Sequence, residues 1–251
     1  LALLDGQVGD HVGWNSEAGR VSVDAILYEN EADLLAGDNL KTLEQVASLA
    51  RQHPETTVFV TLFTNDSGQS KFDLYYGIKR AEILGKALSD RGVSAGRIIL
   101  RSVGSAYPIA RIIIDGAENA EGKRLNQRAE LTFDALDPLG FDFRLERPAV
   151  SELMRLDVIR SLDEQFKGLQ YKVEATVTRQ ILTNDALAMF GEMMIESQPG
   201  TGSYRYTTGS FKQFAQAAQL SRELQGLGFS EARVIAYING IRVSKAEAVG
   251  L

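Results

Sequence analysis

One stretch of this chain, from Val58 to Leu88, constrains the fold most strongly. Its first six residues, ending at Phe63, are almost all apolar and predict a buried strand. The next five, Thr-Asn-Asp-Ser-Gly ending at Gly68, are typical of a turn. Apolar residues then recur at helical spacing until Gly92, which predicts the end of a helix. A strand that leads through a short turn into a long helix is typical of a sheet covered by helices.

The segments around this stretch complete a domain of the α+β class. We expect a strand over 21–28, a helix that begins near Asp38 and ends before Pro54, and two further strands over 97–103 and 128–133. The order β-α-β-α-β-β predicts a sandwich with the helices on one side of the sheet. The apolar run Ile112-Ile113-Ile114 predicts a short extra strand, or a loop packed onto the core, rather than an exposed site.

The last third of the chain has a pattern of its own. Alternating residues over 171–177 and 204–211 predict two strands, and an apolar stripe from Phe214 to Leu227 predicts a helix. A strand over 232–237 turns at Asn239-Gly240 into another over 241–243. Between the two patterned regions, 150–166 has the spacing of an amphipathic helix. We therefore divide the chain into a linker or the end of a preceding domain (1–20), a first domain (21–136), a linker with a helix (137–170) and a second, smaller α+β domain (171–251).

Composition excludes several classes of function. The chain has 251 residues and a net charge of −6, with no basic excess of the kind that nucleic-acid binding needs. It has no cysteine and only His11 and His53, so we expect no metal site and no cofactor. No apolar run is long enough for a transmembrane segment. Because the sequence starts at Leu1, we expect a processed or truncated segment, with any signal peptide or lipid anchor upstream.

The first domain resembles the peptidoglycan-binding domain of the OmpA family. That family has a strand ending in T-D-x-x-G, then Y-N, then L-S-x-x-R-A, and the present chain matches without gaps at Thr64, Gly68 and Arg80-Ala81. Phe72-Asp73 replaces Tyr-Asn, and Asn65 replaces the aspartate. Before the last strand, Leu125–Glu130 is close to the family's N-R-R-x-E, with Gln127 in place of the first arginine.

The resemblance implies a site for the diaminopimelate of a peptidoglycan stem peptide. This amino acid presents an ammonium and a carboxylate at one centre, and an arginine binds a carboxylate through two parallel hydrogen bonds. The residues carried over are Thr64, Asn65, Asp73, Arg80 and Arg128, with Arg80 as the carboxylate partner. Since an amide has no net charge, we expect Asn65 to weaken binding of the ammonium by tenfold or more. Asp73 restores a negative charge if it faces the same pocket.

The second domain resembles the SPOR family, which grips glycan strands. The match is carried by Tyr204-Arg205-Tyr206 leading to Gly209-x-Phe211, by the Ala-rich helix and by Gly228-Phe229 before the closing strands. The resemblance implies a ferredoxin-like fold and a possible glycan contact at Lys172, Glu174 and Arg205. Glu174 stands in place of the family's glutamine. We expect Tyr204 and Tyr206 to lie on the other face of the sheet, under the helix.

Both resemblances favour a non-catalytic protein of the Gram-negative cell envelope, located in the periplasm and associated with the outer membrane. It would tether an outer-membrane assembly to peptidoglycan through the first domain, with the second as a further glycan or protein contact. The departures at Asn65, Gln127 and Glu174 favour an alternative, a scaffold or interaction module in an outer-membrane secretion, motility or assembly complex. An enzyme is the least favoured class, because the sequence has no nucleophile elbow and no phosphate-binding loop.

Overall fold

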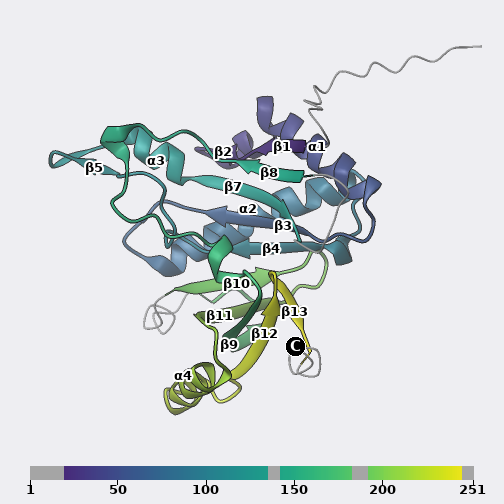
Figure 1. Ribbon diagram of the computed structural model, residues 1–251, viewed down its shortest axis with the longest axis vertical. Helices are drawn as coiled ribbons and strands as arrows, with labels where there is room; N and C mark the ends of the chain where they lie inside the picture. The colour runs from purple at the N-terminus through teal and green to yellow at the C-terminus, as the bar shows by residue number, and fades with distance from the viewer. Residues whose placement is uncertain (1–19, 135–141, 183–191, 245–251) are drawn as a thin grey trace, which may run out of the picture.

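The computed structural model describes residues 20–134, 142–182 and 192–244, and its centre is one mixed sheet of nine strands. The strand order is β13-β12-β9-β11-β10-β4-β3-β7-β2. In Figure 1 the strands of the first half lie above and those of the second half below, and the two sets meet at β4 and β10. The largest group of buried apolar side chains lies on one face of this sheet, and it includes residues from both halves.

The first half follows the order that the sequence predicts, except that the strand expected over 21–28 divides in two, and only its second part joins the nine-stranded sheet. Its strands are β2 (Ile26–Leu27), β3 (Val58–Phe63), β4 (Ile98–Ser102) and β7 (Arg128–Phe133), and its long helices are α1 (Gly37–Gln52) and α2 (Ser70–Asp90). β3 pairs in parallel with β4 and antiparallel with β7, and β2 pairs antiparallel with β7. Both helices bury their apolar stripes in the large core.

Two glycines allow α2 to lie very close to the sheet. A Cβ atom on Gly77 would lie 2.1 Å from Ser102 Oγ, and one on Gly85 would lie 2.6 Å from Leu100 Cδ2. Real Cβ atoms do not approach other atoms so closely. The helix that carries the predicted site therefore has its distance from β4 fixed by the absence of two side chains.

The second half is also α+β. It contains β9 (Leu169–Thr178), β10 (Met193–Ser197), β11 (Tyr204–Phe211), β12 (Arg233–Ile238) and β13 (Ile241–Val243), with α4 (Phe214–Gly226) packed on β9, β11 and β12. The first four strands stand in the spatial order β12-β9-β11-β10, and all their pairings are antiparallel. Asn239 and Gly240 both have positive φ, so the predicted tight turn into β13 is confirmed.

The two halves share one sheet across β4 and β10, which differs from two separate domains joined by a linker. β4 is an edge strand of the first half, and β10 supplies the hydrogen bonds that this edge would otherwise leave open. The register places Glu196 opposite Arg101. β10 was not predicted, because its apolar residues do not alternate with polar ones.

The segment between the halves crosses the sheet face that the long helices leave open. Its strand β8 (Asp142–Glu146) pairs in parallel with β1 (Arg20–Asp24), and the two form a separate small sheet. The helix expected over 150–166 is wrong: this stretch holds only the 3-10 turns η3 (Glu152–Met154) and η4 (Asp163–Gln165). The reason is that its apolar residues do not share one buried face. Leu162 and Phe166 pack on the sheet, whereas Val158 is 76% exposed.

A hairpin and a short helix fill the predicted loop before β7. The hairpin pairs β5 (Ile113–Ile114) with β6 (Ala117–Glu118), which confirms a short extra strand at this place. It projects from the body of the molecule (Figure 1), and Ile113 is exposed, so the loop packed on the core is wrong here, as is the expectation that this run is not exposed. The helix α3 (Ala120–Asn126) then leads into β7. None of the helices in the described ranges combines the length and apolar character that a membrane crossing requires.

Candidate functional site

The turn after β3 is held by its own polar groups. Thr64 donates its backbone N–H to the carbonyl of Gly104 (3.0 Å), which fixes the end of the strand. Asp66 Oδ1 accepts from the backbone N–H of Gly68 (2.8 Å), and Gly68 has φ +78°, a conformation that glycine adopts without strain. The carboxylate of Asp66 therefore serves the turn.

Asp73 lies on the first turn of α2 and is buried. Its carboxylate accepts from the backbone N–H of Ser67 (3.3 Å) and from the hydroxyl of Ser105 (3.1 Å). It thus ties the turn after β3 to the loop after β4, and the N-terminus of a helix favours a negative charge there. These contacts give Asp73 a structural role, and its charge remains inside the corner between the two strand ends.

Arg80, two turns further along α2, stacks on aromatic rings. Its guanidinium carbon lies 5.1 Å from the ring centre of Tyr28 and 5.8 Å from that of Tyr76. Tyr28 donates its hydroxyl to the carbonyl of Phe63 (2.8 Å), so the ring below Arg80 is anchored to the end of β3. Burial raises the pKa of Tyr28 to about 12, and the positive charge of Arg80 acts in the opposite direction.

The corner formed by β3 and α2 has polar groups without partners. Among the described residues no carboxylate pairs with Arg80, whose guanidinium instead interacts with the side chain of Tyr28, and its Nε is buried without a hydrogen-bond partner. The same is true of Thr64 Oγ1 and Asn65 Oδ1. Buried polar atoms are nearly always hydrogen-bonded, so three exceptions among the predicted site residues indicate a place prepared for something else. The cation offers donors, and the other two side chains offer acceptors.

Asn65 is oriented by Gln127, which was expected in the motif before β7 but not in this site. Its Nδ2 donates to Gln127 Oε1 (3.0 Å), and Gln127 Nε2 donates to the backbone carbonyl of Glu29 (2.8 Å). The two amides therefore link Asn65, just after β3, to Gln127, just before β7, and to Glu29, which follows β2. Gln127 and Tyr28 are therefore members of this corner.

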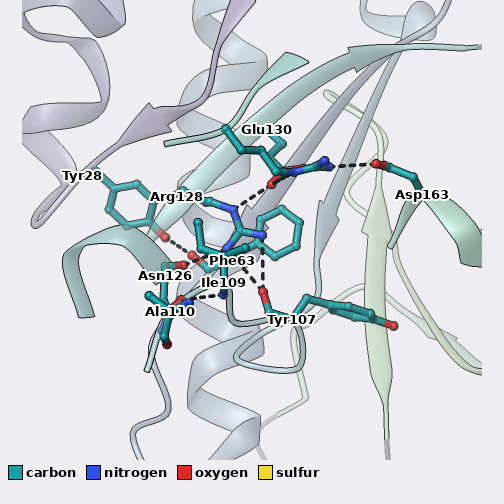
Figure 2. Close-up of polar contacts among 10 residues, drawn as sticks. Tyr28, Phe63, Tyr107, Ile109, Ala110, Asn126, Arg128, Glu130 and Asp163 are labelled. Carbon is teal, nitrogen blue, oxygen red and sulfur yellow. Dashed lines mark hydrogen bonds and ion pairs between the residues drawn. The ribbon is translucent and has the colours of Figure 1, made fainter. Parts of the chain in front are cut away.

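Arg128 is placed differently from the expectation that it belongs to the ligand site. Figure 2 shows its guanidinium enclosed by protein, with Nε donating to Glu130 Oε1 (2.7 Å) and Nη2 to the carbonyl of Tyr107 (3.3 Å). The guanidinium carbon lies 3.8 Å from the ring centre of Phe63. The side chain is only 3% exposed. All of these contacts are internal, so the structure does not bring Arg128 to the Arg80 corner as a free cation.

The Arg128 ion pair continues across the sheet. Arg147 donates to Glu130 Oε2 (2.7 Å) and to Asp163 Oδ2 (2.9 Å), linking β7 to the segment that crosses this face. Burial alone would raise the pKa of Glu130, but the hydrogen bonds and charges of Arg147 and Arg128 outweigh it and hold the pKa below its usual value. The network is a structural element with a buried centre, Arg128 and Glu130, and an exposed end at Asp163.

The three residues predicted for a glycan contact do lie together on one sheet face, but internal partners occupy them. Glu174 is 3% exposed and accepts from Arg205 and from Arg233 Nε (2.7 Å). Lys172 is buried and donates to the carbonyl of Gly209 (3.1 Å). Burial, together with the nearby positive charge of Arg101, lowers the pKa of Lys172 to about 8.

The other face of the second half follows the expectation for its tyrosines. Tyr204 and Tyr206 are buried in the large core with the apolar stripe of α4. Tyr206 accepts a hydrogen bond from the backbone N–H of Leu182 (2.6 Å). Neither ring faces solvent as a sugar-stacking surface would require.

A buried ion pair between Arg101 and Glu196, which the sequence did not indicate, joins the two halves. Arg101 donates to Glu196 Oε2 (3.1 Å) and to the carbonyl of Gly240 (2.6 Å), with both charged side chains nearly fully buried. Its guanidinium carbon lies 4.1 Å from the ring centre of Phe59 and 4.3 Å from that of Phe166. The residues that the structure describes contain no group of three His, Cys, Asp or Glu side chains able to hold a metal ion.

Comparison with known proteins finds similarity to part of the chain, and no family model matches it. A probable lipoprotein, YiaD of Escherichia coli strain K12, is 31% identical over 111 residues, which are 44% of this chain and 48% of YiaD. The chain therefore spans about half the length of this relative. Among solved structures, the peptidoglycan-associated lipoprotein of Burkholderia pseudomallei matches with a TM-score of 0.38 and 24% identity, over 43% of this chain and 88% of that one. The C-terminal domain of Helicobacter pylori MotB matches with a TM-score of 0.39 and 25% identity, over 47% and 89%.

Proposed function

We propose that this protein is a non-catalytic component of the cell envelope that binds peptidoglycan through the corner between β3 and α2. The ligand is the diaminopimelate of a stem peptide, with its carboxylate on Arg80 and its ammonium on the Asn65 side. We place the protein in the periplasm, associated with the outer membrane. The similarity to a probable lipoprotein supports this placement.

The observation that carries the proposal is the state of Arg80. The neighbouring Arg128 is paired with an internal carboxylate, that of Glu130. Arg80 instead lies on the rings of Tyr28 and Tyr76 without an ion pair among the described residues. A guanidinium held in place by aromatic rings, with its charge uncompensated, is suited to a carboxylate that arrives from outside.

Binding of the full chain to purified sacculi tests the proposal. Arg80→Ala should reduce the fraction that sediments with the sacculi by tenfold or more at limiting wall, because a charge-assisted bond contributes roughly 1.5–3 kcal/mol. Arg222→Ala is the matched control, since Arg222 is exposed on α4 and the substitution removes the same charge. Circular dichroism shows whether each variant is folded. Absence of sedimentation by the wild-type protein would contradict the proposal.

For the second half we propose a SPOR-like module, with its sheet as a further wall contact. The strand order β12-β9-β11-β10 supports it, because this is the order of a ferredoxin-like β-α-β-β-α-β sheet. If the module contacts glycan, the chain lacking it should bind sacculi more weakly. Because the halves share a sheet, the contact is better removed by substitution at the exposed Arg233 than by truncation.

A second candidate function is favoured by the same sheet face. Lys172, Glu174 and Arg205 are all held by internal partners, which is what a structural face requires rather than a sugar site. In this candidate the protein is a scaffold in an outer-membrane secretion, motility or assembly complex. Co-purification of a stable protein partner after digestion of the wall, with sacculus binding unaffected by Arg80→Ala, would favour the scaffold.

A further inference from the structure

The carboxamide of Asn65 has a single consistent orientation. The carbonyl of Glu29 can only accept a hydrogen bond, so Gln127 must turn its NH₂ group toward it. Gln127 then presents its oxygen to Asn65, and Asn65 must donate its own NH₂ group to that oxygen. The remaining atom, Asn65 Oδ1, is thereby fixed as an acceptor, and it is buried without a donor.

The acceptor and the cation of this corner are complementary in kind. Arg80 supplies donors and a positive charge, whereas Asn65 supplies an acceptor with no net charge. Arg80 can therefore bind a carboxylate of a ligand, and Asn65 Oδ1 can accept a hydrogen bond from an N–H or O–H group of the same ligand. Because both unpartnered atoms are buried, a ligand reaches them only if the groups that cover them move aside. The hydrogen bonds that it completes offset that movement.

We propose that Asn65 determines the ligand specificity of this corner and that Gln127 positions it. The class of ligand is an α-substituted carboxylate whose neighbouring group is a hydrogen-bond donor, either charged, as in an α-amino acid, or neutral, as in an α-hydroxy acid. This proposal rests on the proposed function, because it concerns the same site. It goes beyond the proposed function in one respect. The donor group next to the carboxylate of the ligand need not carry a positive charge.

The physical basis is the difference between neutral and charge-assisted hydrogen bonds. A carboxylate at position 65 would favour an ammonium over a hydroxyl by about tenfold, since hydrogen bonds between charged partners are about twice as strong. A carboxamide oxygen has no charge with which to discriminate. We therefore expect the two donors to bind within about threefold of each other, and a ligand with no donor to bind about tenfold more weakly.

Calorimetric titration of the full chain with three synthetic stem tripeptides tests this. The first ends in diaminopimelate, the second carries a hydroxyl in place of the terminal α-amino group, and the third carries hydrogen there. The wild-type protein should bind the first two with similar affinity and the third about tenfold more weakly. Asn65→Asp should bind the amino form about tenfold better than the hydroxy form.

Variants of Gln127 separate positioning from folding. Gln127→Leu frees Asn65 to turn its NH₂ group into the corner, so the preference for ligands with a donor should disappear. Gln127→Glu still accepts from Asn65 and should retain that preference, although it cannot donate to Glu29. Gln52→Leu is the control, because this exposed glutamine on α1 bonds only locally to Ser48 among the described residues.

Two different failures can be told apart. If no tripeptide binds and Arg80→Ala does not reduce binding to sacculi, the proposed function itself is refuted. If the amino form binds in an Arg80-dependent way but exceeds the hydroxy form by tenfold or more in the wild-type protein, the function stands and the role of Asn65 is refuted. An unchanged donor preference in Gln127→Leu would refute the positioning role alone.

Discussion

The buried pair Arg101–Glu196 gives the sharpest prediction for stability. The two residues face each other across the β4–β10 junction, and their side chains are 4% and 6% exposed. Removing one partner of a buried pair leaves an uncompensated charge and typically costs 3–5 kcal/mol. Glu196→Met should cost about 4 kcal/mol, because Arg101 then keeps only the carbonyl of Gly240 and two aromatic rings.

The reverse substitution should cost less. In Arg101→Met, the carboxylate of Glu196 retains the hydroxyl of Tyr237 (3.2 Å) and Arg205 (3.4 Å), so we expect about 3 kcal/mol. The double variant should recover more than half of the summed loss, because buried pairs are often replaced by apolar residues at little cost. The coupling free energy should therefore be more than about 3.5 kcal/mol.

Urea denaturation followed by circular dichroism measures these free energies without added salt. The control is the exposed pair Lys86–Asp90, at 2.6 Å with side chains 76% and 59% exposed, where a single substitution should cost no more than about 0.5 kcal/mol. A cost of Glu196→Met no greater than that of Asp90→Met, or additive costs of the two junction substitutions, would show that Arg101 and Glu196 are not a coupled buried pair.

Three further predictions concern the charged faces and the packing of α2. Burial lowers the pKa of Lys172 to about 8 in the folded protein, so the unfolded chain binds more protons between about pH 8 and 10.5. The free energy of unfolding should therefore rise with pH in this range, by about 2 kcal/mol from pH 7.5 to 9.5. Lys172→Met should remove this rise in urea titrations. Gly77→Ala should lower the free energy of unfolding by about 1–3 kcal/mol, because its Cβ would lie 2.1 Å from Ser102 Oγ, and Ser102→Ala in the same chain should restore part of it. Arg128→Met should cost about 3 kcal/mol in the same assay by breaking a buried pair with Glu130; a change in ligand affinity with no loss of stability would contradict its structural role.

The sequence predicted the elements whose signals are local. β3, α2 and the turn between them follow from an apolar run, a glycine with positive φ and a helical stripe, and the structure has all three. The same holds for β11, α4 and β12. In each case the pattern that buries the side chains also selects the backbone conformation, so the residues themselves carry the information.

The parts that were missed depend on pairing between distant residues. The helix expected over 150–166 was wrong because its apolar spacing does not correspond to one buried face. The partners of Arg128 and Glu174 decide whether these side chains are available, and the sequence does not show which opposite charges meet in space. Likewise, Gln127 lies 62 residues from Asn65, and only the fold brings their amides together.

The junction of β4 and β10 also limits how the molecule can engage a large surface. Since hydrogen bonds run from strand to strand across it, the Arg80 corner and the C-terminal strands keep one spacing and one angle. Two contacts on a polymer such as a cell wall would then have to match that geometry, and lengthening the segment that connects the halves would not relax the requirement. Binding through both contacts would therefore depend on the spacing of the two ligand sites as well as on their chemistry.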